Sequence, residues 1–232
     1  MKIPKVNFRS LFDQCLLCQQ SYKGLDQKPS GICAGCLDDL PILTQKCSHC
    51  SLPLSTSNDL ICGECSTKPP SYDHVDSFFL YRFPIDHLIG QVKYSQKVQY
   101  IGLIASLMHH FSNIPPSVEA LIPIPMYRLN QFKRGFNQAE LIARGLSRHT
   151  HIPVDTQLLT KLHASHPQMG LSRLERLKNQ KGSFACTPSE YDHVMLIDDV
   201  MTTGATLETV SQVLKQNGVA RVSALTLART ER

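Results

Sequence analysis

The sequence lacks any hydrophobic run long enough to span a membrane. Its most apolar window, Ile101–Met108, is far shorter than the roughly 20 residues that a transmembrane helix needs. Residues 1–10 also lack the apolar core of a secretory signal peptide. These two absences argue against an integral membrane protein and against an exported one. They predict a cytoplasmic protein without membrane insertion.

The composition has neither the low hydrophobic content nor the high charge of a disordered chain. Hydrophobic residues make up 42% and charged residues 19% of the 232 positions, which is typical of a globular protein with one or two domains. The net charge is +5, and residues 126–181 hold ten Lys/Arg against three Asp/Glu. Such a surplus attracts the phosphates of a small ligand or of nucleic acid, although a solvated basic surface would give the same count.

Cysteine is the residue type with the clearest pattern. Eight of the nine cysteines form four C-x-x-C pairs, separated by 14, 10 and 11 residues. Two thiolates held two residues apart can bind one ion from a tight turn, and two such turns complete a tetrahedral zinc site. Four pairs therefore predict two zinc sites. Disulfides are disfavoured because the cytoplasm keeps thiols reduced.

Consecutive pairs are close enough in the sequence to share an ion, while an interleaved pairing remains an alternative. We assign the two Zn²⁺ ions to two sets of ligands: Cys15, Cys18, Cys33 and Cys36, then Cys47, Cys50, Cys62 and Cys65. All four ligands of each ion come from the protein, so the sites are predicted to be structural. The segment has little apolar mass, and its fold should depend on zinc. We predict a double zinc-ribbon domain over 1–70 and a second domain over 71–232.

The second domain alternates strand patterns with helical ones. Strand patterns occupy 74–81, 120–125, 194–197 and 221–228, and amphipathic helical patterns occupy 85–92, 98–108, 139–148 and 207–214. Such alternation predicts an α/β fold, with a parallel sheet flanked by helices.

The stretch Val194–Thr206, VMLIDDVMTTGAT, carries the clearest sign of a ligand site. Four apolar residues indicate a buried strand, Asp198 and Asp199 follow it, and the hydroxyl-rich turn Thr202–Thr206 leads into a helix. Ligands of α/β sheets bind at the carboxyl ends of strands, and the free N–H groups of a helix start suit a phosphate. Adjacent acids cannot bind that phosphate, so we expect them to accept hydrogen bonds from two ribose hydroxyls. The alternative is an ordinary turn whose acids cap a helix.

This stretch resembles, at every position, the 13-residue phosphoribosyl pyrophosphate (PRPP) signature of type I phosphoribosyltransferases. The resemblance implies that Asp198 and Asp199 hold the 2′- and 3′-hydroxyls. It further implies that Thr202, Thr203, Gly204, Ala205 and Thr206 surround the 5′-phosphate, with Val200 and Met201 between them and the acids. Mg²⁺ would accompany the pyrophosphate group.

A basic segment, Met126–Gln138, follows the second predicted strand and is expected to be a loop before the next helix. A loop rich in donors after a parallel strand is well placed for the pyrophosphate end of PRPP. Our candidates are Arg128, Lys133 and Arg134, and Arg134 precedes the flexible Gly135. For a transfer reaction, the candidate catalytic residues are Asp198, Asp199 and Arg134.

Three features of the sequence together resemble the ComF family. They are the four cysteine pairs, the string RGFNQAELIARGL from Arg134 and the string QMGLSRLERLKN over 168–179. Members of this family are competence-associated proteins that join a zinc-ribbon segment to a phosphoribosyltransferase-like domain. The resemblance spans essentially the whole chain. Met126 and Tyr127 depart from the Leu-His expected there, so no imidazole role is expected at that point.

The ComF resemblance implies a cytoplasmic accessory to natural transformation that handles incoming single-stranded DNA, with DNA-uptake or recombination proteins as possible partners. The candidate nucleic-acid-binding residues are Lys133, Arg134, Arg173 and Arg176. Residues 161–183 correspond to a mobile hood that closes over the reaction in phosphoribosyltransferases.

Three functions remain open: a phosphoribosyltransferase with an unidentified acceptor, a PRPP sensor without catalysis, and the DNA-handling role, which is compatible with either. Purine-salvage relatives often place an acid at the first position of the phosphate loop. Here that position is Thr202, which argues against a hypoxanthine- or guanine-type reaction.

Overall fold

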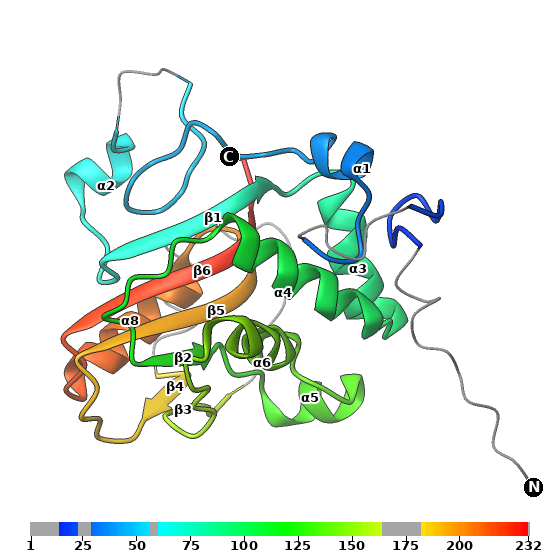
Figure 1. The fold of residues 1–232 in the computed structure, drawn as a ribbon. Helices are drawn as coiled ribbons and strands as arrows, with labels where there is room; N and C mark the ends of the chain where they lie inside the picture. The colour runs from blue at the N-terminus through cyan, green and yellow to red at the C-terminus, as the bar shows by residue number, and fades with distance from the viewer. Residues whose placement is uncertain (1–13, 23–28, 56–59, 164–181, 232) are drawn as a thin grey trace, which may run out of the picture.

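The fold is built on a four-stranded parallel sheet. The computed structural model describes residues 14–22, 29–55, 60–163 and 182–231. The strands stand in the order β1–β6–β5–β2 (Figure 1). Their bounds are His74–Leu80 for β1, Ala120–Pro123 for β2, His193–Met201 for β5 and Arg221–Arg229 for β6. The predicted parallel α/β sheet is confirmed.

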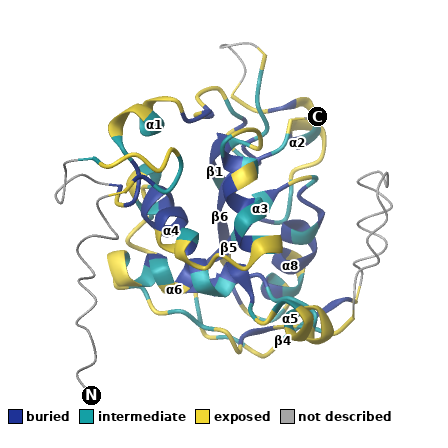
Figure 2. Cartoon of the chain, turned by 90° about the vertical axis from the view of Figure 1, so that its right-hand side faces the viewer, coloured by how far each residue is buried: buried dark blue, intermediate teal, exposed yellow. Residues whose placement is uncertain are grey.

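Helices cover both faces of the sheet, which is why its strands are apolar on both sides. Three helices pack on one face: α3 (Ile85–Ser95), α4 (Gln99–Phe111) and α6 (Gln138–Thr150). The opposite face is covered by α8 (Ala205–Gln216). Figure 2 shows the buried strands between α4 and α6 on one side and α8 on the other. The amphipathic patterns predicted in the sequence correspond to these helices.

The chain reverses its direction across the sheet between β2 and β5. A bridge between Leu121 and Val154 extends the sheet beyond β2, and the intervening α6 lies on the first face. From β5 the chain returns through α8, on the other face, to β6. The segments that follow two neighbouring parallel strands therefore diverge to opposite faces. Such a switch point is where open α/β sheets bind ligands, outside the carboxyl ends of the strands.

Within the described residues, three further short elements lie next to the sheet. The helix α5 (Arg128–Arg134) follows β2, and β3 (Leu159–Lys161) pairs with β4 (Phe184–Cys186) as an antiparallel ribbon. We expected a loop at 126–138, and that prediction was wrong for the part that forms α5. The apolar residues of α5 are exposed, so the segment has no buried helical face that an apolar pattern in the sequence could indicate.

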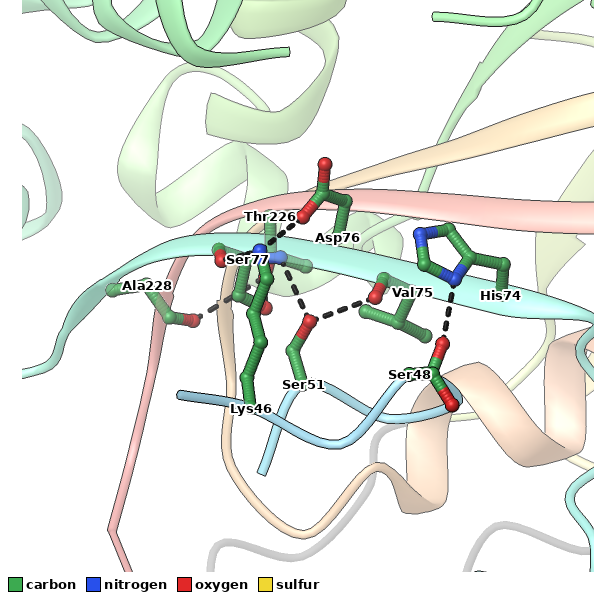
Figure 3. A network of polar contacts seen from close by, with 9 residues as sticks. All are labelled: Lys46, Ser48, Ser51, His74, Val75, Asp76, Ser77, Thr226 and Ala228. Atoms are coloured by element: carbon green, nitrogen blue, oxygen red, sulfur yellow. Dashed lines mark hydrogen bonds and ion pairs between the residues drawn. The ribbon is translucent and has the colours of Figure 1, made fainter. Parts of the chain in front are cut away.

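The cysteine-rich segment contains α1 (Ala34–Asp38) and α2 (Gly63–Thr67) and lies along the outer edge of β1. Leu43 N donates to the Phe78 carbonyl (2.8 Å), and Val75 N donates to the His49 carbonyl (2.9 Å). Ser51 Oγ donates to the Val75 carbonyl at 2.7 Å (Figure 3). An edge strand otherwise leaves a row of main-chain groups unpaired, and this segment satisfies them.

A second set of contacts fixes the same edge through side chains. Lys46 forms an ion pair with Asp76 and donates to the Ser77 carbonyl at 2.8 Å (Figure 3). The Ser77 hydroxyl lies 2.7 Å from the hydroxyl of Thr226 on the neighbouring strand β6. The proposed boundary at residue 70 thus separates two segments that are hydrogen-bonded to each other.

Within the described part of the chain, none of the helices has the length and apolarity required to cross a membrane.

Candidate metal and ligand sites

The eight paired cysteines form two separate clusters. The first cluster consists of Cys15, Cys18, Cys33 and Cys36, and the second of Cys47, Cys50, Cys62 and Cys65. Within each cluster the sulfur atoms all lie within 4.8 Å of one another. Consecutive pairs therefore share a site, as predicted, and the interleaved alternative is excluded.

The sulfur spacing fits tetrahedral zinc. Sulfurs about 2.3 Å from a central Zn²⁺ lie about 3.8 Å from each other. The structure has 3.8 Å between the sulfurs of Cys18 and Cys33, and 3.7 Å between those of Cys50 and Cys62. Both clusters thus suit a structural Zn²⁺ ion held entirely by the protein.

Main-chain amides support the thiolate ligands. The second pair of each cluster begins a short helix, in which Cys33 Sγ accepts from Cys36 N (3.5 Å) and Cys62 Sγ accepts from Cys65 N (3.5 Å). Burial acts to raise the pKa of Cys47, but main-chain N–H groups, led by that of Cys62, outweigh it and lower this pKa to about 7, whereas burial raises the pKa of Cys50 to about 11. A thiolate, not a thiol, is the form that binds zinc.

The predicted ligand site lies at the end of β5. The strand continues through both acids to Met201, beyond the apolar run that predicted it. Asp199 is buried with 4% exposure and Asp198 is half-buried, and Asp199 N donates to Asp198 Oδ1 at 2.8 Å. The two carboxylates are therefore held next to each other at the carboxyl edge of the sheet, beside the switch point.

Lys93 forms an ion pair with this acidic pair. It extends from the last turn of α3, and its Nζ lies 2.7 Å from Asp199 Oδ2. Burial acts to lower the pKa of Lys93, but the charge and hydrogen bond of Asp199, together with the charge of Asp198, outweigh it, so the pKa is raised. Burial and then the neighbouring charge of Asp199 raise the pKa of Asp198 to about 8. At neutral pH the pair of acids thus retains a proton, and Lys93 balances the remaining charge.

A second lysine, Lys161, interacts with the acidic pair electrostatically. Lys161 of β3 lies above the ring of Phe184, 5.2 Å from its centroid. Burial lowers the pKa of Lys161, and the charge of Asp198 opposes this shift, so the two groups are electrostatic neighbours. The sequence places Lys161 at the start of the predicted hood and Lys93 at the end of a helix, but it does not predict that either lysine is close to the two acids. Neither lies near the acids in the sequence, so no local pattern indicates the contact.

The turn Thr202–Thr206, hereafter the phosphate turn, connects β5 to α8. Gly204 precedes the helix with φ +76°, and the helix start has no side-chain cap from it. A Cβ at this position would lie 2.5 Å from Met201 Cε, the flexible end of a side chain that can shift, so the positive φ is the main reason for glycine here. Thr202 is exposed, while Thr203 and Thr206 are half-buried. Ala205 N donates to Thr203 Oγ1 at 3.4 Å, and the turn brings main-chain N–H groups and hydroxyls to a helix start, where phosphates bind.

The candidate cations lie on and next to α5. Arg128 and Lys133 are exposed, whereas Arg134 is half-buried and donates to Gln138 Oε1 at 2.8 Å. Asn137 caps α6 by accepting from Ala139 N, and its amide donates to the Ile124 carbonyl at 3.0 Å. This contact ties the segment after α5 to the end of β2. Arg173 and Arg176, and most of the predicted hood, lie outside the described residues.

Two aromatic residues, one on α5 and one on α3, are strongly exposed. Phe132 on α5 has 88% of its surface exposed, and Tyr94 at the end of α3 has 82%. Phe136 and Tyr127, the other aromatic candidates in this region, are half-buried.

Comparison with known proteins agrees with both halves of the molecule. Residues 10–66 match the double zinc ribbon domain family. The chain is 31% identical over 236 residues to competence protein F of Haemophilus influenzae, covering 96% of this chain and 97% of that protein. This chain belongs to the ComF family. Two further relatives show how far that family reaches.

The DNA utilization protein YhgH of Escherichia coli K12 is 31% identical to this ComF-family chain over 207 residues, covering 86% of this chain and 91% of that protein. Competence protein ComFC of Bacillus subtilis is 26% identical over 243 residues, covering 93% and 95%. These matches extend over both halves of the chain and over nearly the whole length of the relatives.

Proposed function

We propose that this ComF-family protein binds PRPP at the carboxyl edge of its sheet and takes part in handling single-stranded DNA during natural transformation. The observation that supports PRPP most directly is the placement of two acids and the phosphate turn. Asp198 and Asp199 lie near the carboxyl end of β5, and the turn opens α8 at the switch point of the sheet. In this proposal the acids hold the ribose hydroxyls, and Thr202–Thr206 hold the 5′-phosphate.

The cations of the segment after β2 complete the proposed site. That segment starts at the other side of the switch point, so Arg128, Lys133 and Arg134 are the groups assigned to the pyrophosphate. Mg²⁺ bound to the pyrophosphate would offset part of its negative charge, and it prefers oxygen ligands such as the carboxylates at this edge. Burial and the charge of Asp199 raise the pKa of Asp198, so the pair carries less negative charge and repels an anionic ligand less.

The double mutation Asp198→Asn and Asp199→Asn tests the site. We expect it to abolish PRPP binding measured by calorimetry with Mg²⁺, because amides replace the paired acids at nearly equal volume. Circular dichroism and zinc content should stay as in the wild type. An unaltered affinity would contradict the assignment.

Whether PRPP is consumed depends on an acceptor. A transferase holds the sugar and the leaving group in place and brings up a nucleophile. Thr202 occupies the position of the acid that often assists a purine base, so the acceptor would be of another kind, or the protein would act as a sensor. Pyrophosphate release from PRPP with Mg²⁺ and a mixture of bases distinguishes these cases. Release no faster than a blank favours sensing.

The proposed DNA role has its support in the names of the relatives and in one surface. Exposed aromatics next to cations are typical of single-strand binding, where bases stack on rings and phosphates meet positive charge. Phe132 and Lys133 offer this combination on α5, with Tyr94 exposed on α3. Charge reversal at Lys133 and Arg134 should weaken oligonucleotide binding and reduce its salt dependence. An unchanged salt titration would place the binding surface elsewhere.

A further inference from the structure

Arg229 is a charged side chain that the proposed site does not use. It ends β6 and is fully buried, with 0% of its surface exposed. A buried guanidinium is tolerated only where acceptors satisfy its donors. Here the acceptors are main-chain carbonyls of two distant segments. Nε donates to the Cys50 carbonyl at 3.1 Å, and Nη1 donates to the Met201 carbonyl at 3.0 Å and to that of Thr202.

These carbonyls belong to the second zinc cluster and to the start of the phosphate turn. Cys50 is one of the four ligands of that cluster, and Thr202 is the first residue of the turn. The main chain next to Arg229 adds a further bond, from Thr230 N to the Met201 carbonyl at 3.1 Å. Arg229 therefore connects the metal site to the turn through a single side chain.

The other end of the turn is held by the residues that follow the same cluster. The Tyr72 hydroxyl lies 3.5 Å from the point where a Cβ of Gly204 would stand, and the Tyr72 side chain is buried. Ser71 donates to Glu208, in the first turn of α8, from its N and from its Oγ, both at 2.8 Å. The segment that leaves the second cluster thus contacts both the turn and the start of its helix.

Charge favours the same arrangement. Four thiolates around one Zn²⁺ carry about two net negative charges, so the loaded cluster places a counter-charge close to the buried guanidinium. The planar fork of arginine can reach carbonyls on two segments at once, whereas the ammonium of lysine offers its donors from one point.

We propose that Arg229 is a positioning residue, and that the zinc-loaded second cluster holds the phosphate turn in its binding conformation through it. This inference rests on the proposed function only for the identity of the ligand. A turn that binds phosphate through main-chain amides works best when those amides are fixed beforehand. The proposal gives the first cluster no role in holding the turn. This cluster packs on the opposite face of the sheet, with the residues of α3 and α4.

Hydrogen exchange in the zinc-loaded full chain, without PRPP, tests the proposal. In Arg229→Lys we expect the amides of residues 200–206 to exchange roughly tenfold faster or more, the factor that corresponds to losing one hydrogen bond from a charged donor. The control is Arg221→Lys, at the exposed start of the same strand, where exchange in the turn should stay as in the wild type. Unchanged exchange in Arg229→Lys overturns the proposal.

A second pair of variants covers the case in which Arg229→Lys does not fold. Cys62→Ser weakens the second cluster and Cys36→Ser the first, with zinc content measured in both. The proposal expects faster exchange of the turn in Cys62→Ser alone, and equal exchange in the two variants overturns it. PRPP binding by the wild type is measured separately. If it fails while the exchange results hold, the ligand is wrong and the role of Arg229 stands.

Discussion

Replacement of Lys93 by methionine tests the electrostatics of the acidic pair. Methionine keeps most of the volume of the lysine stem but removes the charge that lies 2.7 Å from Asp199. The carboxylate is then left buried without its counter-ion. We expect a less stable protein, and a loss of stability that grows with pH.

The magnitude follows from the burial of the pair. Removing one partner of a fully buried ion pair costs about 3–5 kcal/mol. The lysine side chain here retains 21% exposure and the aspartate 6%. Solvent therefore screens part of the effect, and we expect a loss of about 2 kcal/mol at pH 9. In a chain of this size each kcal/mol lowers the melting temperature by about 2–4 °C, which gives about 4–8 °C.

The pH dependence has a definite sign. Asp198 has a folded pKa of about 8, well above its ordinary value of 3.8, so between these pH values the folded state binds more protons than the unfolded one. The stability that this proton contributes is present at low pH and is lost as the pH rises through about 8. Lys93 offsets the loss when the acids ionise. At pH 6 a proton on the acidic pair can neutralise a carboxylate in place of the lysine charge. The loss of stability caused by Lys93→Met should therefore be smaller at pH 6 than at pH 9, by about 1 kcal/mol.

Thermal unfolding of wild type, Lys93→Met and Lys97→Met at pH 6 and pH 9 provides the assay. Lys97 is exposed shortly after the end of the same helix and serves as the matched control for charge removal. If Lys93→Met has the same melting temperature as Lys97→Met at pH 9, the ion pair does not have the role described. The same conclusion follows if the stability lost in Lys93→Met is equal at both pH values.

Three further outcomes follow from the packing and the metal sites. Removal of zinc by a chelator should release two ions per chain and unfold the cysteine-rich segment. Metal release and the reaction of eight newly accessible thiols measure this. Release of zinc without a change in circular dichroism would contradict it. Gly204→Ala should cost about 1 kcal/mol or more from its positive φ, and should weaken PRPP binding in calorimetry by more than it lowers the melting temperature. Gly145→Ala places a Cβ 2.6 Å from that of Ala105 between α6 and α4, and should cost about 1–3 kcal/mol in denaturant unfolding without altering zinc content.

The features that the sequence predicted well are encoded locally. The pairing of the cysteines was predictable because neighbouring C-x-x-C turns are close along the chain, and the structure confirms their order. The strand and turn of Val194–Thr206 were predictable because an apolar run, two acids and a glycine-containing turn occur within 13 residues. Their assignment to PRPP stays a prediction.

The contacts that the sequence did not reveal join residues far apart. Lys93 meets an acid more than a hundred positions later, and in the sequence it is simply a cation at the end of a helix. Arg229 follows the apolar pattern of the last strand, where a charge would be expected to face solvent. The packing of several elements determines the positions of both side chains. Neither the periodicity nor the spacing of residues in the sequence predicts that packing. The exposed helix α5 was missed because it has no apolar face to the core.

The position of the cysteine-rich segment bears on where a polyanion would bind. Residues 1–70 carry seven Lys/Arg and six Asp/Glu. Two zinc ions with eight thiolates add about four negative charges, so the loaded segment is an unfavourable platform for DNA. The same segment closes the free edge of β1 and contacts the phosphate turn through Arg229. We therefore expect the metal sites to stabilise the sheet edge and the phosphate turn. DNA binding is expected to depend on the basic, aromatic surface of α5.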